Sequence, residues 1–300
     1  MERIRLSETL SFSRIAAGFW RLMDWNMSLS TLEKFIHSLL EMGITTFDHA
    51  DIYGDYSCEA EFGKVLKHHP GLRDKMQLVT KCGIKLRSDK FPGTGVNHYD
   101  TSYDHIVASA EQSLRNLHTE QIDLLLIHRP DPLMDFAEIA RAFFQLRSSG
   151  KVLNFGVSNF NPLQYDALNK HFARKLVTNQ VEYSPYCLES FQNGNMDFFM
   201  RERIHPMAWS PVAQGRLFNP SDEKGKRVAG VLWEIAEECT LDDISPLIYA
   251  WILYHPAGII PIVGSGRIER VKDAVDALQI KLTREQWYRI YVASMGEPLP

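Results

Sequence analysis

Short apolar runs and amphipathic segments alternate along almost the whole chain, and this alternation limits the fold more than any other feature. Each run has the length of a buried strand, and the segment after it carries apolar residues at the spacing of a helix. The helical segment 31–42, for example, has apolar residues at Leu32, Phe35, Ile36 and Leu39. Strands that alternate with helices form parallel sheets with right-handed connections.

Eight such units can be counted, which is the number in a (β/α)8 barrel. The expected strands are 15–18, 45–48, 77–81, 122–128, 152–158, 176–182, 205–209 and 259–263. Open doubly wound sheets also alternate, but no Gly-x-Gly-x-x-Gly follows the first strand, which argues against a Rossmann domain. We therefore expect an α/β protein with a single barrel domain over residues 1–300.

Additions to this barrel are expected at both ends and in one loop. Residues 4–6 and 12–15 flank a polar turn, which predicts a short β-hairpin before the first strand. An extra C-terminal helix is expected near 283–293, after the last barrel helix. Residues 211–227 are polar and contain glycine and proline, which predicts a loop long enough to act as a lid.

Composition and charge exclude several classes of protein. The chain has 300 residues, of which 45% are apolar and 23% charged, as in an ordinary globular protein. The net charge of −4 leaves no basic stripe, so a nucleic-acid partner is not expected. No cluster of Lys and Arg suggests a membrane surface. The apolar stretch that starts at Leu247 is interrupted by His255 and Pro256 before it is long enough to cross a bilayer.

The N-terminus and the cysteines indicate the cellular compartment to expect. Residues 1–8 are too charged to form the core of a signal peptide. The four cysteines show no Cys-x-x-Cys spacing and suggest reduced thiols: Cys58, Cys82, Cys187 and Cys239. We therefore expect a cytoplasmic protein, and a monomer as the default state.

Four residues of different chemistry stand at the ends of apolar runs. Asp48, Lys81 and His128 each close such a run, and Tyr53 lies in the loop that adjoins Asp48. In a parallel barrel the C-terminal ends of all strands meet on one face, where catalytic residues gather. A carboxylate, an amine, an imidazole and a phenol on one face predict a proton-transfer site.

Each of these four residues has an ordinary structural explanation when it is taken alone. A loop tyrosine usually packs or lies at the surface, and a lysine that ends a strand is more often exposed than catalytic. A histidine after an apolar strand is often half-buried, and an aspartate before a loop often caps a helix. All four together, in this order, are not expected by chance, so we interpret them as one candidate active site.

The chain resembles the aldo-keto reductase family over nearly its whole length. The resemblance begins with Thr-Thr-Phe-Asp-His-Ala-Asp-Ile-Tyr-Gly (45–54), Gln-Leu-Val-Thr-Lys (77–81) and Ile-Asp-Leu-Leu-Leu-Ile-His (122–128). It implies a barrel whose bottom is closed by the N-terminal hairpin. It also implies direct hydride transfer from a nicotinamide cofactor to the carbonyl carbon of an aldehyde or ketone, which becomes an alcohol.

The resemblance implies a role for each of the four side chains. Tyr53 would supply the proton to the carbonyl oxygen. Because a free tyrosine has a pKa near 10, the ammonium of Lys81 is expected to lower the pKa of Tyr53, with Asp48 orienting Lys81. His128 would hydrogen-bond the substrate carbonyl and help to polarise it.

Further motifs resemble the segments that hold the nicotinamide end of the cofactor. Ser158 and Asn159 in Gly-Val-Ser-Asn-Phe (156–160) would hold the carboxamide together with Gln180. The end of the first strand is expected to touch the cofactor through Gly18, Phe19 and Trp20, and Asp48 is expected to touch it too. A plain core aromatic is the competing interpretation of Phe19 and Trp20.

Trp209 stands where the family usually stacks a tyrosine on the nicotinamide, and it keeps a flat aromatic face. The residues after it are expected to contact the pyrophosphate: Ser210, Pro211, Val212, Gln214, Gly215 and Arg216. In the segment 261–273, the contacts expected for the 2′-phosphate and adenine are Ser265, Arg267, Arg270 and Asp273. Because arginine binds phosphate through a bidentate fork, NADPH is expected to be preferred over NADH.

Two functions from other classes stay open. Potassium-channel β subunits share this fold and tetrad but act mainly through a partner, so a cofactor-binding regulatory or redox-sensing module is the main alternative. His49 and Asp51 beside His128 suggest a metal-dependent barrel hydrolase, although no His-x-His pair occurs on the first strand. We otherwise interpret His49 as lying beside the tetrad or at the surface, and Glu59 and Glu61 as solvated residues of the second helix.

Overall fold

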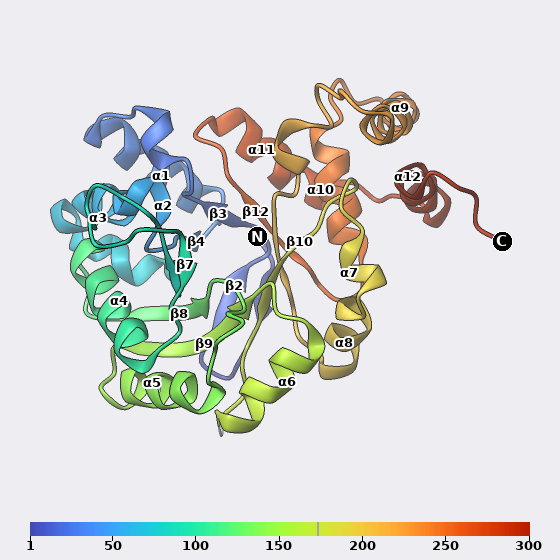
Figure 1. The fold of residues 1–300 in the computed structure, drawn as a ribbon. Coiled ribbons are helices and arrows are strands. Elements are labelled where there is room, and N and C mark those ends of the chain that lie inside the picture. The colour runs from blue at the N-terminus through green and yellow to red at the C-terminus, as the bar shows by residue number, and fades with distance from the viewer. Residues whose placement is uncertain (173) are drawn as a thin grey trace. The chain divides into compact units, whose positions relative to one another are not determined.

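The computed structural model describes residues 1–172 and 174–300, which form two compact units. Unit 1 comprises residues 1–179 and 264–266, and unit 2 comprises residues 180–263 and 267–300. Eight strands form a closed barrel in the order β10-β11-β12-β3-β4-β5-β8-β9 (Figure 1). This barrel, with helices between its strands, confirms the predicted (β/α)8 class.

The strands of unit 1 are parallel and pair in chain order: β3 (Ala16–Gly18), β4 (Thr46–Asp48), β5 (Gln77–Cys82), β8 (Ile122–Ile127) and β9 (Val152–Ser158). Their register places Gly18 beside Asp48, and Lys81 beside Leu126. Nearly all their residues are buried, as expected for strands covered on both faces. The five predicted strands are confirmed, and each boundary differs by no more than one residue.

Four of the six α-helices in the described residues of unit 1 begin at a side chain that accepts from a backbone N–H of the first turn. The helices are α1 (Leu29–Glu41), α2 (Tyr53–Tyr56), α3 (Cys58–His68), α4 (Tyr103–Asn116), α5 (Phe136–Ser148) and α6 (Pro162–His171), with 3₁₀ turns at Leu22–Trp25 and Pro70–Lys75. Asp135 accepts from the backbone N–H of Ala137 (2.7 Å) at the start of α5, and Asn161 forms a capping box with Gln164 at α6. In Figure 1, α4 and α5 run alongside β8 and β9.

An N-terminal hairpin sits at the start of the barrel strands, as predicted. It consists of the antiparallel strands β1 (Arg3–Arg5) and β2 (Ser11–Ser13). Arg3 donates to Thr45 Oγ1 (2.7 Å) and to Gln77 Oε1 (3.0 Å), and the backbone N–H of Ser13 donates to Thr46 Oγ1 (3.1 Å). Since these partners lie where β4 and β5 begin, the hairpin contacts the end opposite to Asp48.

A second, smaller hairpin was not predicted. The loop after β5 contains β6 (Ile84–Lys85) and β7 (His98–Tyr99), which pair antiparallel. Each strand has only two residues, and the loop between them is exposed and polar. Such a pair has no hydrophobic periodicity for a sequence reading to detect.

Three further parallel strands follow, of which only the first residue belongs to unit 1 and the rest to unit 2: β10 (Asn179–Glu182), β11 (Met207–Trp209) and β12 (Ile260–Val263). The helices of unit 2 are α7 (Glu189–Gln192), α8 (Asn195–Glu202), α9 (Glu223–Glu238), α10 (Ser245–Tyr254), α11 (Ile268–Asp276) and α12 (Arg284–Met295), with 3₁₀ turns at Ala213–Gly215 and Ala277–Gln279. The predicted loop 211–227 is wrong in its last residues, because Asp222 caps α9 by accepting from the backbone N–H of Gly225 (2.8 Å). Among the described residues, no helix is both long and apolar enough to cross a membrane.

The C-terminal helix is held to the core of unit 2 by two tryptophans. The rings of Trp251 on α10 and Trp287 on α12 stack with centroids 5.0 Å apart and planes 5° apart. Each indole N–H donates to the backbone carbonyl of the other residue at 3.1 Å. This reciprocal pair buries both rings and satisfies both donors, so the predicted last helix is a fixed part of unit 2.

Candidate active site

The ammonium of Lys81 joins three of the four tetrad positions within unit 1. Its Nζ donates to Asp48 Oδ2 at 2.8 Å, to the backbone carbonyl of His49 at 2.7 Å and to Tyr53 Oη at 3.0 Å. The side chain is fully buried, and that of Asp48 is 4% exposed. Burial lowers the pKa of Lys81, but Asp48 and Tyr53 together raise it by more, so its net shift is upward and Lys81 stays charged.

Tyr53 presents its phenol to this ammonium from the first residue of α2. Burial raises the pKa of Tyr53, Lys81 lowers it and Asp48 raises it, with a net shift upward. The expectation that Lys81 brings this pKa down is therefore wrong in its net direction, because burial outweighs the ammonium. The phenol keeps its proton at neutral pH, which is the form that a proton donor requires.

His128 follows β8 and completes the group. Its ring lies edge-on to that of Tyr53, with centroids 5.8 Å apart and planes at 76°. Burial lowers the pKa of His128 well below its ordinary value, and the nearby charges of Lys81 and Arg129 lower it further. The ring is therefore neutral and has one N–H donor, which suits a hydrogen bond to a substrate oxygen. Asp48, Tyr53, Lys81 and His128 thus lie together in the structure.

The predicted carboxamide contacts of unit 1 lie next to His128. Ser158 ends β9, and Asn159 follows it with a positive φ of 61°. Asn159 Nδ2 donates to Ser158 Oγ at 2.8 Å and to the backbone carbonyl of His128 at 3.5 Å. A non-glycine residue in the left-handed region is a strained feature that is common at functional sites. The bond from Asn159 to His128 has no signal in the sequence.

The two aromatic residues that follow β3 differ in burial: Phe19 lies in the core and Trp20 at the surface. Phe19 is fully buried and its ring contacts Trp25, Phe47, His49 and Phe62. Its side chain therefore packs in the core, as the competing interpretation expected. Trp20 is 52% exposed, with the guanidinium of Arg21 5.1 Å from its ring centroid. Gly18 ends β3 beside Asp48, as predicted for a strand end at the site.

The other predicted cofactor contacts lie mostly in unit 2 and stay predictions. Gln180 and Pro211 are buried, whereas the exposed or partly exposed ones are Trp209, Ser210, Val212, Gln214, Gly215, Arg216, Arg267, Arg270 and Asp273. Ser265, in unit 1, is also partly exposed. The turn after β11 has positive φ at Ser210 (51°), Ala213 (50°) and Gln214 (57°). Such a strained turn is a further feature that is common at binding loops.

Comparison with known proteins agrees with this geometry. The family model of the aldo/keto reductases matches residues 14–293.

The chain belongs to the aldo/keto reductase family.

This family member is 50% identical to the uncharacterized oxidoreductase YcsN of Bacillus subtilis over 100% of both chains. It is 44% identical to a 6-dehydroglucose reductase of Agrobacterium fabrum, with 99% of each chain covered. The crystal structure of the thermostable aldo-keto reductase Tm1743 shares its fold, with a TM-score of 0.82, 24% identity and coverage of 98% of this chain and 100% of that one. The chain is therefore an oxidoreductase of the aldo/keto reductase type.

Of the two alternatives for His49, the place beside the tetrad holds, since its backbone carbonyl accepts from Lys81, and the surface one is wrong. His49 does not lie at the surface: it is fully buried between Phe19 and Phe62, with centroids 4.9 and 4.5 Å away. Burial and the charge of Lys81 lower the pKa of His49 to about 3, so it is neutral. Glu59 is not solvated either, since it is 1% exposed beneath β5. Within the described residues, no group of three His, Cys, Asp or Glu side chains is placed to hold a metal ion.

Glu59 should make the stability of this family member depend on pH. Its carboxyl accepts from Thr80 Oγ1 (2.6 Å) and Asn116 Nδ2 (3.3 Å), and burial raises the pKa of Glu59. In the unfolded chain the carboxyl loses its proton near pH 4.5, whereas the folded protein holds it to higher pH. The free energy of unfolding therefore falls as pH rises from 4.5 through the folded pKa.

The variant Glu59→Gln should remove this part of the pH dependence and be more stable at neutral pH by on the order of 1 kcal/mol. Urea unfolding at several pH values measures the difference from wild type. Glu61→Gln is the matched control, because Glu61 lies on the same helix but is only partly buried and pairs with Lys64. If the free energy of unfolding depended on pH equally in wild type and in Glu59→Gln, Glu59 would not be the source of this pH dependence.

A tight turn after Tyr53 requires glycine. Gly54 has φ 57°, and a Cβ there would lie 2.6 Å from both Cys58 Sγ and Met23 Cγ. Gly54→Ala should therefore lower the free energy of unfolding by about 2 kcal/mol, from the left-handed conformation and the clash together. Thermal and urea unfolding measure this loss. Gly71→Ala is the control, since nothing lies within 4 Å of its Cβ position, and an equal loss in both variants would refute the assignment.

Proposed function

We propose that this protein reduces an aldehyde or ketone to an alcohol with NADPH, and that Tyr53 donates the proton. The observation that carries the proposal is the buried Lys81 ammonium, which hydrogen-bonds both Asp48 and the phenol of Tyr53. A half-buried phenol held by a cation, next to a neutral imidazole, is a proton donor beside a hydrogen-bond donor.

In the proposed reaction, the substrate oxygen lies between Tyr53 and His128. His128 donates a hydrogen bond that polarises the carbonyl, and Tyr53 transfers its proton as negative charge develops on that oxygen. The phenolate left on Tyr53 is stabilised by Lys81 at 3.0 Å, and Asp48 holds Lys81 in place from the other side. The ammonium therefore acts mainly after the proton has moved, which agrees with a phenol that is protonated beforehand.

The residues of unit 1 fit a nicotinamide cofactor, which supplies the hydride when bound. The hydroxyl of Ser158 and the side-chain amide of Asn159 form an adjacent polar pair at the end of β9, of the kind that can hold a carboxamide. The contacts inferred from resemblance in unit 2, Trp209 to Arg216 and the exposed Arg267 and Arg270, belong to the same proposal. The two arginines support NADPH over NADH.

Oxidation of NADPH by the purified protein tests the proposal. The substrates would be activated aldehydes, ketones and diones, with NADH in parallel. One relative is named a 6-dehydroglucose reductase, so 6-dehydroglucose belongs in the panel. We expect turnover with NADPH that exceeds turnover with NADH. Tight binding of NADPH without turnover of any substrate would contradict the reductase and favour a cofactor-binding regulatory module.

A further inference from the structure

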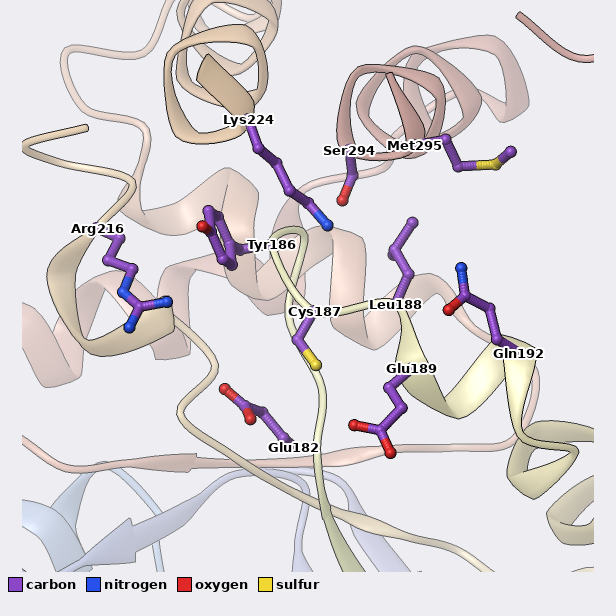
Figure 2. A pocket seen from close by; sticks show the side chains of 10 residues that line it. All are labelled: Glu182, Tyr186, Cys187, Leu188, Glu189, Gln192, Arg216, Lys224, Ser294 and Met295. Atoms are coloured by element: carbon purple, nitrogen blue, oxygen red, sulfur yellow. The ribbon is translucent and has the colours of Figure 1, made fainter. Parts of the chain in front are cut away.

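A polar cavity of about 360 Å³ lies within unit 2, and no residue of the tetrad lines it. Its walls come from the end of β10 and the segment that leads into α7, from the start of α9 and from the end of α12 (Figure 2). This volume is at the lower end of the range for ligand sites in proteins. The cavity therefore suits a small molecule of amino-acid size.

Two cations of the cavity share one aromatic ring. The guanidinium carbon of Arg216 lies 5.4 Å, and Lys224 Nζ 5.2 Å, from the ring centroid of Tyr186. The hydroxyl of Tyr186 donates to Asp222 Oδ2 at 3.0 Å, which fixes the ring. Burial also lowers the pKa of Lys224, so its ammonium is partly withdrawn from water. The ammonium of Lys224 borders the cavity and can attract an anion there.

The carboxylates of the cavity lie on another side. Glu182 comes from the end of β10 and Glu189 from the first residue of α7. In Figure 2 both carboxylates are at the bottom of the view, whereas the ammonium of Lys224 points down from the top. In this view the ammonium of Lys224 is thus separated from both carboxylates, whereas the guanidinium of Arg216 lies to the left. A ligand that carries both charges matches this arrangement better than a simple anion or cation.

A buried hydroxyl gives an independent sign of a ligand. Ser294 is 2% exposed, borders the cavity and has no hydrogen-bond partner for its Oγ among the described residues. Figure 2 shows this Oγ on the same side as the ammonium of Lys224. Because a buried hydroxyl without a partner is unfavourable, a bound acceptor at this place would stabilise the protein.

We propose that this cavity binds a small zwitterion of the α-amino-acid type. Its carboxylate lies against Lys224 and accepts a hydrogen bond from Ser294. Its ammonium lies against Glu189 and Glu182. Arg216 is also a predicted pyrophosphate contact, so Lys224 is the side chain that tests the cavity by itself. The proposal does not depend on the reductase activity.

Ligand-observed NMR on the full-length protein tests it, with the twenty common L-amino acids as probes and with and without saturating NADPH. Calorimetry then gives the affinity of each amino acid that binds. We expect binding of at least one of them in both states. The matching decarboxylated amine should bind at least tenfold more weakly, because it lacks the group that Lys224 and Ser294 hold. No binding at about 10 mM would overturn the proposal.

Two variants of α9 complete the test. Lys224→Met should weaken binding at least tenfold. Lys226→Met should not, because Lys226 pairs with Glu223 at 2.8 Å and does not border the cavity. Melting temperatures confirm that both variants are folded. Equal affinity in wild type and Lys224→Met, or displacement of the amino acid by NADPH, would overturn the proposal.

Discussion

Tyr53→Phe should lower kcat by 10²- to 10⁴-fold, because it removes only the hydroxyl that donates the proton. The ring stays, so the contact with the ring of His128 at 5.8 Å is kept. NADPH affinity, measured by fluorescence titration, should stay within about twofold of wild type, since the proposed role concerns the substrate oxygen. The rate of NADPH oxidation in steady state measures kcat.

Tyr56→Phe is the matched control for this variant. Tyr56 lies three residues further along the same turn, and its hydroxyl accepts from the backbone N–H of Leu86 at 2.8 Å. This variant also loses a phenol hydroxyl but leaves the tetrad intact, so its kcat should stay close to that of wild type. If Tyr53→Phe lost NADPH binding and kept its turnover at saturating NADPH, Tyr53 would be a cofactor contact and not the proton donor.

Lys81→Met should destabilise the protein by about 3–5 kcal/mol, because it leaves the buried carboxylate of Asp48 without the ammonium that faces it at 2.8 Å. It also removes the donor to Tyr53 and to the His49 carbonyl. Turnover should fall by at least 10²-fold, since no cation remains to stabilise the phenolate. Urea unfolding and NADPH oxidation measure the two effects.

The double variant Asp48→Asn/Lys81→Met separates stability from catalysis. Replacing both members of a buried ion pair is often nearly neutral for stability, so most of the lost free energy of unfolding should return. Turnover should not return, because the cation is still missing. Recovery of both stability and turnover would show that Lys81 has only a structural role.

The barrel could be predicted because its strands are recognisable in the sequence as short apolar runs. β8 is an apolar run interrupted only by Asp123, and α1 carries the apolar stripe that predicted the helical segment 31–42. The short helices α7 and α8 were missed. α7 has four residues, too few for a periodic pattern, and Phe191 within it is held by rings distant in sequence, Tyr183 and Tyr291.

The sequence indicates which residues form the candidate site but not how they affect one another's pKa. Asp48, Lys81 and His128 stand where strand ends are visible in the sequence, and the structure places them together with Tyr53. Burial raises the pKa of Tyr53. The extent of this burial is set by the folded chain, so the direction of the shift could not be predicted from the sequence.

Two other contributions near the site have no sequence signal. The backbone carbonyl of His49 accepts from Lys81, and a backbone group is the same in every residue. In the sequence, Glu59 has the pattern of a solvated helix residue. In the structure α4 covers it, and Asn116 of α4 donates to its carboxyl. In both cases the contact depends on packing between segments distant in the chain.

In the proposed reaction, hydride passes directly from the cofactor to a carbonyl carbon while the protein supplies the proton. NADPH carrying deuterium at nicotinamide C4 tests it, with the two C4 epimers used separately and the alcohol analysed by mass spectrometry. We expect only one of the two epimers to give an alcohol with deuterium on its carbinol carbon. The reason is that the protein holds the cofactor with one face of the nicotinamide toward the substrate. An alcohol without deuterium from either epimer would contradict direct transfer.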